Sequence, residues 1–415
     1  MSRFIRRSAA ALPALIVAIG TSAAVALPAQ AASTWSAPIT LPAGVGSAAF
    51  AENASGAQIA VTGTGPQVSS SANGKTWSAP VTVATGGTDA AIALSANGRA
   101  VVVWHGGTAT APVLQASTEA APGGAWSAPV TISTLNVAAQ APLVSIDGSG
   151  NAIVAWSGAT ATNVLGAINT ASLPAGGAWT AVKTLDATGS STIRLVANAT
   201  GSAIITWSDE DNIWADSGTI LGGFTAPVDI GQALGYEHRP RISFMALNNA
   251  GQAVVAYTPQ STIGMAAIRS ASGTWGATMA LPCSGAGNPA IDGAGDVVVL
   301  CGESTSTSTY TTRLPAGSST WSTPALLTSN TIAGTTVAAD SAGTFVIAWV
   351  ALTTVNNTGV ETVTVVTSPP GGAFGTATTF PVTLFDNIDL NIATGSATLV
   401  WNTSSGAFES TGPVS

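Results

Sequence analysis

Short apolar stretches separated by glycine-rich turns run through the chain from residue 32 to its end. In the clearest unit, the stretches 90–95, 100–104, 113–117 and 126–132 are bounded by Gly, Asn, Asp and Pro. β-Branched residues dominate these stretches, which is typical of β-strands between turns. No stretch keeps the 3.6-residue apolar period of a helix over a sufficient length. The pattern predicts an all-β chain built from units of four strands.

Two motifs repeat along this region and define its period. The first is Trp-Ser-Ala-Pro followed by β-branched residues, and the second is Gly, two residues and a short apolar run that ends in Trp. Neighbouring copies of the first motif lie 42 to 53 residues apart. Self-similarity of this length indicates a propeller or a solenoid. The first motif starts at Trp35, Trp77, Trp126, Trp179, Phe224, Trp275, Trp321 and Phe374, and the second ends at Thr62, Trp104, Trp156, Trp207, Tyr257, Cys301, Trp349 and Trp401.

Four antiparallel strands in about 48 residues form a β-propeller blade, so eight copies predict an eight-bladed propeller. Seven blades are the alternative if one unit is irregular. Stacked blades bury both faces of each sheet, which explains strands that are apolar throughout, and we expect the repeated aromatic residues to pack between blades. The first two strands are joined by turns that open with Asp147, Asp292 or Asp340. These Asp residues are expected to bond their own turns, with calcium ligation as the alternative.

The phase of the repeat predicts how the ring closes. After residue 31 the chain begins with a fourth-strand motif at Trp35 and ends after a third strand, residues 407–411. The N- and C-terminal strands should therefore share the last blade, which hides the free sheet edges.

The first 31 residues have the features of a secretory signal peptide. Arg3, Arg6 and Arg7 precede an apolar stretch, and Ala29-Gln30-Ala31 offers the small residues that a signal peptidase reads. The alternative is a membrane anchor, although the uninterrupted apolar core is short for a span. We therefore expect a secreted protein, exported by the Sec or the Tat route, with a single propeller domain over residues 32–415 and no membrane anchor after cleavage.

The scarcity of charged residues excludes one class of function. Only 7% of residues are charged, with 11 Lys and Arg against 19 Asp and Glu and a net charge of −8. Nucleic-acid binding requires clustered cations, so that class is excluded. Two cysteines, Cys283 and Cys301, are expected to form a disulfide in an oxidising compartment, with two buried thiols as the alternative. A monomer is expected.

The Trp-Ser-Ala-Pro strand after a Ser/Gly-rich hairpin resembles the Asp-box, or bacterial neuraminidase, repeat of sialidase-type propellers. The best copy is residues 71–77, in which Asn73 stands where the repeat has Asp and one intervening residue is missing. Other copies, such as residues 270–275, lack the acid. The resemblance implies a β-propeller architecture. The resemblance to sialidases implies a six-bladed propeller with an arginine triad. This chain instead has eight repeats and lacks a Phe-Arg-Ile-Pro-like strand. No catalytic residue is therefore carried over from the family.

The densest group of charges falls in loops that a propeller places on one face. Loops between the second and third strands and loops between blades emerge on the same side, where rigid scaffolds commonly bind ligands. His105 and Glu303 occupy equivalent loops. The candidate ligand-binding residues are Arg194, Asp209, Glu210, Asp211, Tyr236, Glu237, His238, Arg239 and Arg241.

Several interpretations of this group remain open. The loops can be simply solvated, with surface ion pairs of little energetic value. The Arg residues and acids can bind a sugar or an acidic ligand. Three carboxylates can hold Ca²⁺, and Glu237 with Asp209 can form a glycosidase-like acid/base pair. No metal-binding spacing or phosphate-binding loop is recognised. We expect a binding protein without catalysis that recognises a glycan or a protein; the alternatives are a sialidase-like glycoside hydrolase and a structural secreted protein.

Overall fold

The structure is a computed structural model, and from Trp35 onward the chain forms one compact unit. The predicted signal peptide, residues 1–31, lies outside the described residues. In the part of the chain that is described, no helix is long and apolar enough to cross a membrane. The described residues are 35–41, 49–62, 65–135, 141–158, 166–190, 192–209, 212–232, 241–259, 263–302, 308–355, 358–382, 385–393, 395–403 and 406–414.

The strands form eight separate antiparallel sheets, each of which is one blade. Blade 1 contains β2 (Ala49–Glu52), β3 (Gln58–Val61), β4 (Gln67–Ser71) and β5 (Val81–Thr82). Blade 2 contains β6 (Thr88–Leu94), β7 (Ala100–Thr108), β8 (Ala111–Glu119) and β9 (Val130–Thr134). Blade 3 contains β10 (Leu143–Ile146), β11 (Ala152–Ser157), β12 (Gly166–Leu173) and β13 (Lys183–Ser190). Blade 4 contains β14 (Thr192–Ala197), β15 (Ser202–Ser208), β16 (Asn212–Thr219), and a fourth strand in two pieces, β17 (Gly223–Phe224) and β18 (Val228–Gln232).

The second half of the chain repeats this arrangement. Blade 5 contains β19 (Arg241–Leu247), β20 (Ala253–Thr258), β21 (Ile263–Arg269) and β22 (Met279–Ser284). Blade 6 contains β23 (Ala286–Ile291), β24 (Val297–Gly302), β25 (Thr309–Leu314) and β26 (Ala325–Thr328). Blade 7 contains β27 (Thr331–Ala339), β28 (Phe345–Val355), β29 (Thr358–Ser368) and β30 (Thr378–Val382). Blade 8 contains β31 (Phe385–Ala393), β32 (Ser396–Thr403), β33 (Gly406–Pro413) and β1 (Ile39–Thr40).

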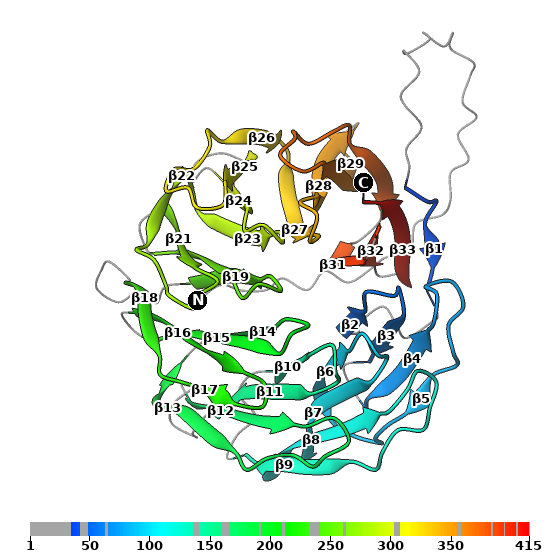
Figure 1. Cartoon of the computed structure of the whole chain (residues 1–415). Coiled ribbons are helices and arrows are strands. Elements are labelled where there is room, and N and C mark those ends of the chain that lie inside the picture. The colour runs from blue at the N-terminus through cyan, green and yellow to red at the C-terminus, as the bar shows by residue number, and fades with distance from the viewer. Residues whose placement is uncertain are drawn as a thin grey trace, which may run out of the picture. The chain divides into compact units, whose positions relative to one another are not determined.

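The blades form a closed ring, seen down its axis in Figure 1. The first strand of each blade contacts the first strand of the next, and β31 of blade 8 contacts β2 of blade 1. The protein is therefore an eight-bladed β-propeller, as the repeat predicts, and the seven-bladed alternative is wrong.

The ring is closed by the two ends of the chain, as the phase of the repeat predicts. Strand β1 pairs with β33 so that Ile39 lies opposite Glu409 and Thr40 opposite Phe408. The Ser36 amide donates a hydrogen bond to the Thr411 carbonyl oxygen, 2.8 Å away. The first strand-forming segment of the described chain thus completes the sheet formed by the last.

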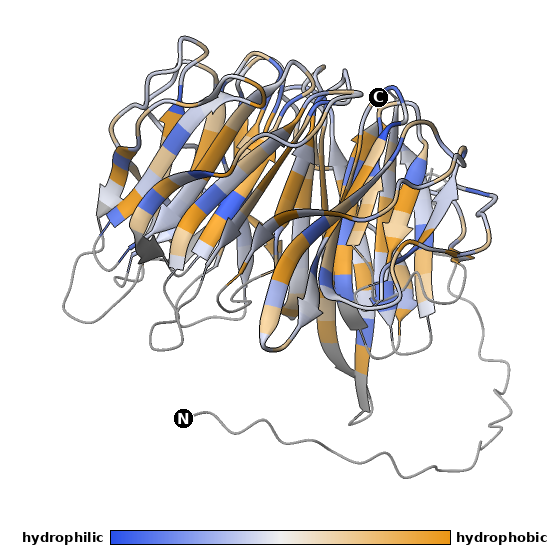
Figure 2. Cartoon of the chain, turned by 90° about the horizontal axis from the view of Figure 1, so that it is seen from below, coloured by the Kyte–Doolittle hydropathy of each residue, from blue (hydrophilic) through white to orange (hydrophobic). Residues whose placement is uncertain are grey.

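One apolar cluster fills each junction between neighbouring blades, and Figure 2 shows the hydrophobic bands along the strands. The aromatic residues of both motifs lie in these clusters, as expected. Those that end the second strand, such as Trp104 and Trp156, are fully buried. Those of the Trp-Ser-Ala-Pro motif, such as Trp126, are mostly only half-buried because they lie near the outer edge of the blade.

The predicted fourth strand of blade 2 is too long at its start. The sequence predicts it over residues 126–132, but β9 begins at Val130. Trp126 makes only an isolated bridge to Glu119. Pro129 has no amide hydrogen, so continuous pairing cannot begin before it.

We call the side with the turns between first and second strands the turn face, and the opposite side the loop face. On the turn face, Asp292 Oδ1 accepts hydrogen bonds from the amides of Ala294, Gly295 and Asp296 at 2.8–2.9 Å. Asp147 and Asp340 bond their turns in the same way. These Asp residues hold turns together, which is the structural role expected for them.

Where the turn begins with Asn, its side chain also reaches the next blade. The side-chain amide of Asn198 donates to the Asn248 carbonyl oxygen at 2.8 Å, and that of Asn248 donates to the Asp292 carbonyl oxygen at 2.7 Å. The Asn53 amide does the same to Ser95 at 2.9 Å. A series of hydrogen bonds therefore links neighbouring blades on the turn face.

The cysteines form the predicted disulfide. Cys283 of blade 5 and Cys301 of blade 6 are bonded, with Cα atoms 5.9 Å apart. The bond therefore joins two blades, and the alternative of two free thiols is wrong.

Candidate functional site on the loop face

Only part of the predicted charged group lies among the described residues. Arg194, Asp209 and Arg241 are described, and all three lie at the loop-face ends of strands in blades 4 and 5. For Arg241 only the backbone is described, as the first residue of β19. Whether the group converges on one ligand stays a prediction. Glu210, Asp211, Tyr236, Glu237, His238, Arg239 and Glu303 lie outside the described residues.

Arg194 is half-buried on the innermost strand of blade 4. Its Nη1 atom donates to the carbonyl oxygen of Ile193 at 3.1 Å, and its guanidinium lies 5.8 Å from the ring centroid of Phe244 in blade 5. Burial lowers the pKa of the Arg194 guanidinium from its usual range. The cation is thus held by an aromatic ring across a blade junction.

Asp209 is engaged in its own hairpin. Its Oδ1 atom accepts from the Asn212 amide at 2.7 Å, and its Oδ2 atom accepts from Nε1 of Trp214 at 2.6 Å. Such bonds stabilise the turn between the second and third strands of blade 4. Asp209 therefore serves the loop scaffold, and its acid/base pairing with Glu237, which lies outside the described residues, stays a prediction.

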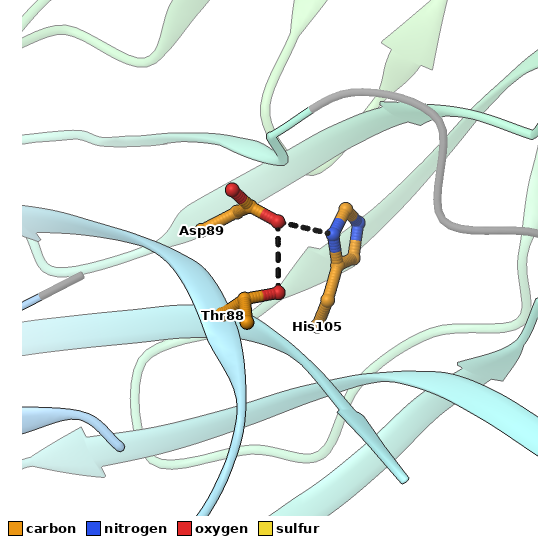
Figure 3. A network of polar contacts seen from close by, with 3 residues as sticks. All are labelled: Thr88, Asp89 and His105. Carbon is orange, nitrogen blue, oxygen red and sulfur yellow. Dashed lines mark hydrogen bonds and ion pairs between the residues drawn. The ribbon is translucent and has the colours of Figure 1, made fainter. Parts of the chain in front are cut away.

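A second polar group, in blade 2, consists of Thr88, Asp89 and His105 (Figure 3). His105 Nδ1 lies 3.2 Å from Asp89 Oδ2, and the Thr88 hydroxyl donates to the same oxygen at 2.8 Å. The His105 side chain is 5% exposed, whereas the Asp89 side chain is 51% exposed. A nearly buried imidazole is thus held by a carboxylate that reaches solvent.

The backbone at Asp89 adopts an unusual conformation. Asp89 has a φ of 56°, the one positive value among the described non-glycine residues. It lies in a β-bulge, since Thr88 pairs with His105 and the next partners are Ala91 and Val103. Bulges redirect side chains and are frequent beside functional sites, and a left-handed conformation at a non-glycine residue often marks such a site.

Gly87 permits this arrangement. Its φ is 121°, and an added Cβ would overlap Cδ1 of Trp104 and lie 2.9 Å from the His105 carbonyl oxygen. Only glycine fits here without displacing the core tryptophan or the strand that carries His105.

The blade 2 group offers hydrogen-bonding capacity to a ligand. Both of its bonds use Asp89 Oδ2, and within the described residues Oδ1 of Asp89 and Nε2 of His105 make no hydrogen bond. Sequence reasoning placed His105 on this face but missed Asp89. His105 lies within β7, not in the loop that the sequence predicts, because β7 continues to Thr108 and residue 105 pairs with Thr88 beside Asp89.

A cavity of about 350 Å³ lies between blades 7 and 8. The rings of Phe380 and Trp401 are stacked at 5.4 Å with planes 21° apart, and Phe408 continues the stack at 6.0 Å and 19°. Thr403 supplies a hydroxyl at the loop-face end of β32. The pocket is therefore aromatic and mostly apolar. Pro38, Pro381 and Val382 complete its lining.

Within the described residues, no group of three or more His, Cys, Asp or Glu side chains could hold a metal ion. The predicted trio of Asp209, Glu210 and Asp211 falls partly outside these residues.

Comparison with solved structures identifies the fold class. The Dos1 propeller is similar with a TM-score of 0.55 and 9% identity, over 90% of this chain and 93% of that chain. A lectin from Burkholderia pseudomallei has a TM-score of 0.51 and 13% identity, over 81% and 99%. An ulvan lyase, a polysaccharide lyase, has a TM-score of 0.50 and 8% identity, over 88% and 93%. These likenesses show the propeller fold alone. No protein family and no curated protein matches the sequence.

Proposed function

We propose that this propeller is a secreted glycan-binding protein that recognises its ligand on the loop face without catalysis. The observation that carries the proposal is the Thr88–Asp89–His105 group. A carboxylate that is half exposed, has one unbonded oxygen and is fixed by two hydrogen bonds is a suitable acceptor for sugar hydroxyls. A preorganised group loses little conformational freedom on binding.

Two further features support a glycan as the ligand. The half-buried cation of Arg194 lies on the same face, and an arginine can bind an acidic sugar through paired hydrogen bonds. The pocket between blades 7 and 8 offers aromatic surface at the loop-face ends of its strands. The loop residues of the predicted charged group, including Tyr236 and Glu237, would add to the site. A lectin is among the solved propellers of similar fold.

The test is a glycan microarray with neutral, sialylated and uronic-acid-containing probes, followed by calorimetric titration of the best probe. Asp89→Asn retains the shape and the tolerance of positive φ but removes the charge, and we expect binding to weaken about tenfold, or about 1.4 kcal/mol. Lys75→Gln, on the exposed turn face, is the matched control and should bind as the natural protein does. Equal binding by Asp89→Asn and the natural protein would contradict this site.

A second function is favoured by one specific observation, the contact between His105 and Asp89. An imidazole oriented by a carboxylate can act as a general acid or base, which fits a glycoside-acting enzyme. Incubation with fluorogenic sialosides and other glycosides distinguishes the two functions. Turnover that is lost in His105→Asn or in Glu237→Gln would contradict a binding-only protein. Absence of both glycan binding and turnover, together with a protein pull-down without a specific partner, would support a structural role.

A further inference from the structure

The junction that closes the ring differs in polarity from the other seven. We call the contact between blade 8 and blade 1 the closing junction. Among the described residues its apolar cluster has four buried members, Leu41, Ala60, Val400 and Ala407, whereas every other junction has six or more. Hydrophobic burial, the main favourable contribution to packing, is therefore smallest where the ring closes.

Carboxyl groups occupy the remaining space in the closing junction. Glu52 comes from β2 of blade 1, and Asp389 and Glu409 come from β31 and β33 of blade 8. The Thr398 hydroxyl donates to Glu52 Oε1 at 3.1 Å, and the side-chain amide of Gln58 donates to Glu409 Oε1 at 3.1 Å. Both hydrogen bonds run between the two blades. The junction is thus held in part by bonds to carboxyl groups.

These carboxyl groups are incompletely bonded. Oε2 of Glu52 and Oε2 of Glu409 are buried without a hydrogen-bond partner in the described part of the chain, and Glu409 is 2% exposed. Gly74, in the turn above, packs directly against Gln58 and Glu409. An ionised carboxylate that lacks such partners is costly to bury, whereas its protonated form is much less so.

Among the described residues, no cation compensates these acids. The groups that act on the Glu52 carboxyl are Thr398, Glu409, Gln58 and Asp389, and none of them is basic. The nearest basic residue along the chain, Lys75, is exposed in the turn that covers Glu409 and makes no ion pair with a described residue. The junction therefore gathers up to three negative charges.

The electrostatic consequence has a definite sign. Burial, with a contribution from the charges of Glu409 and Asp389, raises the pKa of Glu52 from 4.5 to about 7. Burial also raises the pKa of Glu409 and of Asp389. Folding therefore favours the protonated acids. For Glu52 this stabilising contribution is fully present below its unfolded pKa, near 4.5, and is lost as the pH rises through about 7.

We propose that the closing junction is a pH-sensitive latch, which holds blades 8 and 1 together while its buried carboxyl groups are protonated and loosens when they ionise. The latch opens between β33 and β1 on one side and β2 and β3 on the other. The other seven junctions have larger apolar clusters and remain packed. This inference does not depend on which ligand the loop face binds.

The test combines thermal unfolding with hydrogen exchange at pH 5 and pH 8, corrected for the intrinsic exchange rate. In the natural protein we expect protection of β1, β2 and β33 to fall at pH 8, while β10 and β11 of blade 3, which contain no acidic residue, keep theirs. In Glu52→Gln/Glu409→Gln, which keeps only Asp389 of the three acids, the protection of the closing junction should change less between the two pH values than in the natural protein. Its melting temperature should fall less between pH 5 and pH 8 than that of the natural protein.

Glu361→Gln in blade 7 is the matched control and should retain the natural pH dependence. If the double variant does not fold, Glu52→Gln alone, which keeps the acceptor for Thr398, should show a reduced pH dependence. The proposal is overturned if protection falls equally in all blades, if it does not change with pH, or if the glutamine variants keep the natural slope.

Discussion

The side-chain amide of Asn248 donates a hydrogen bond to the main-chain carbonyl oxygen of Asp292, across the junction between blades 5 and 6 at 2.7 Å. The same Asn bonds its own turn through Oδ1, which accepts from the amides of Ala250 and Gln252 at 3.0 Å. One side chain therefore fixes both the shape of a turn and its position against the next blade.

Asn248→Asp should destabilise the propeller by about 2 kcal/mol, because an acceptor then faces the Asp292 carbonyl oxygen in place of a donor. The turn itself should persist, since Oδ1 remains. Chemical denaturation measures the loss. Asn330→Ala, in an exposed turn of the junction between β26 and β27, is the control. A change of less than a few tenths of a kcal/mol in Asn248→Asp would show that the bond between blades contributes little.

The converse change, Asp292→Asn, should stabilise the protein by about 1 kcal/mol. Oδ2 of Asp292 lies beside Gly343 in the turn of blade 7, and an amide nitrogen in its place would carry no charge into this junction. Burial raises the pKa of Asp292, so the charge costs stability once the pH exceeds the ordinary value for Asp. The gain should therefore be larger at pH 7 than at pH 4 in denaturation experiments. A gain in stability that is independent of pH would refute the electrostatic part of this explanation.

Gly87→Ala should distort the blade 2 group. The added methyl group would overlap Trp104, so we expect a loss of about 2 kcal/mol in stability. The near-ultraviolet circular dichroism of the tryptophans should change, and any glycan binding through Asp89 should weaken. The same change at Gly86, where an added Cβ meets no atom within 4 Å, is the control. Identical behaviour of the two variants would contradict the packing argument.

Removal of residues 32–42 should open the ring. The deletion removes Trp35 and Leu41 from two apolar clusters together with all pairing of β1. Core substitutions at such residues each cost several kcal/mol, so a total loss of about 5 kcal/mol or more is expected. Calorimetry of the protein with and without these residues checks it. An unchanged melting temperature would exclude closure by the N-terminal segment.

The Cys283–Cys301 disulfide should contribute about 3 kcal/mol, since it closes a loop with a sequence separation of 18. Cys283→Ser/Cys301→Ser should lower the midpoint of denaturation by the corresponding amount. A reducing agent should lower the stability of the natural protein and leave that of the double variant unchanged. If the reducing agent affects both proteins equally, the stabilisation does not come from this bond.

Much of the fold could be predicted because the repeat carries the same information eight times. Trp104 and Trp156 mark equivalent positions, so one unit with clear turns defines the others. Closure of the ring by the two ends of the chain could be predicted from Trp35, because its motif belongs to the fourth strand of a blade. What could not be predicted were deviations within a repeat, such as the split fourth strand of blade 4, which depend on local packing.

The polar sites were harder to predict for a physical reason. Asp89 reaches His105 because of a bulge and a left-handed backbone conformation, and neither has a distinct sequence signal. Glu52, Asp389 and Glu409 are single acids on three different strands. Only the strand register and the closure of the ring bring them into one interface. The charge density of the sequence drew attention to residues 209–241 instead.

Closure by β1 and β33 also sets an order of events during biosynthesis. Ser36 and Thr411 are bonded although 375 positions separate them, so the segment that contains β1 receives its partner only after all the other blades have been made. Contacts of such long range form late and slowly. Until then β1 has no partner strand, and β2 and β3 of blade 1 lack the blade that covers them. A chain interrupted before residue 406 would expose these surfaces permanently, and a quality-control protease would have a structural basis for recognising it as incomplete.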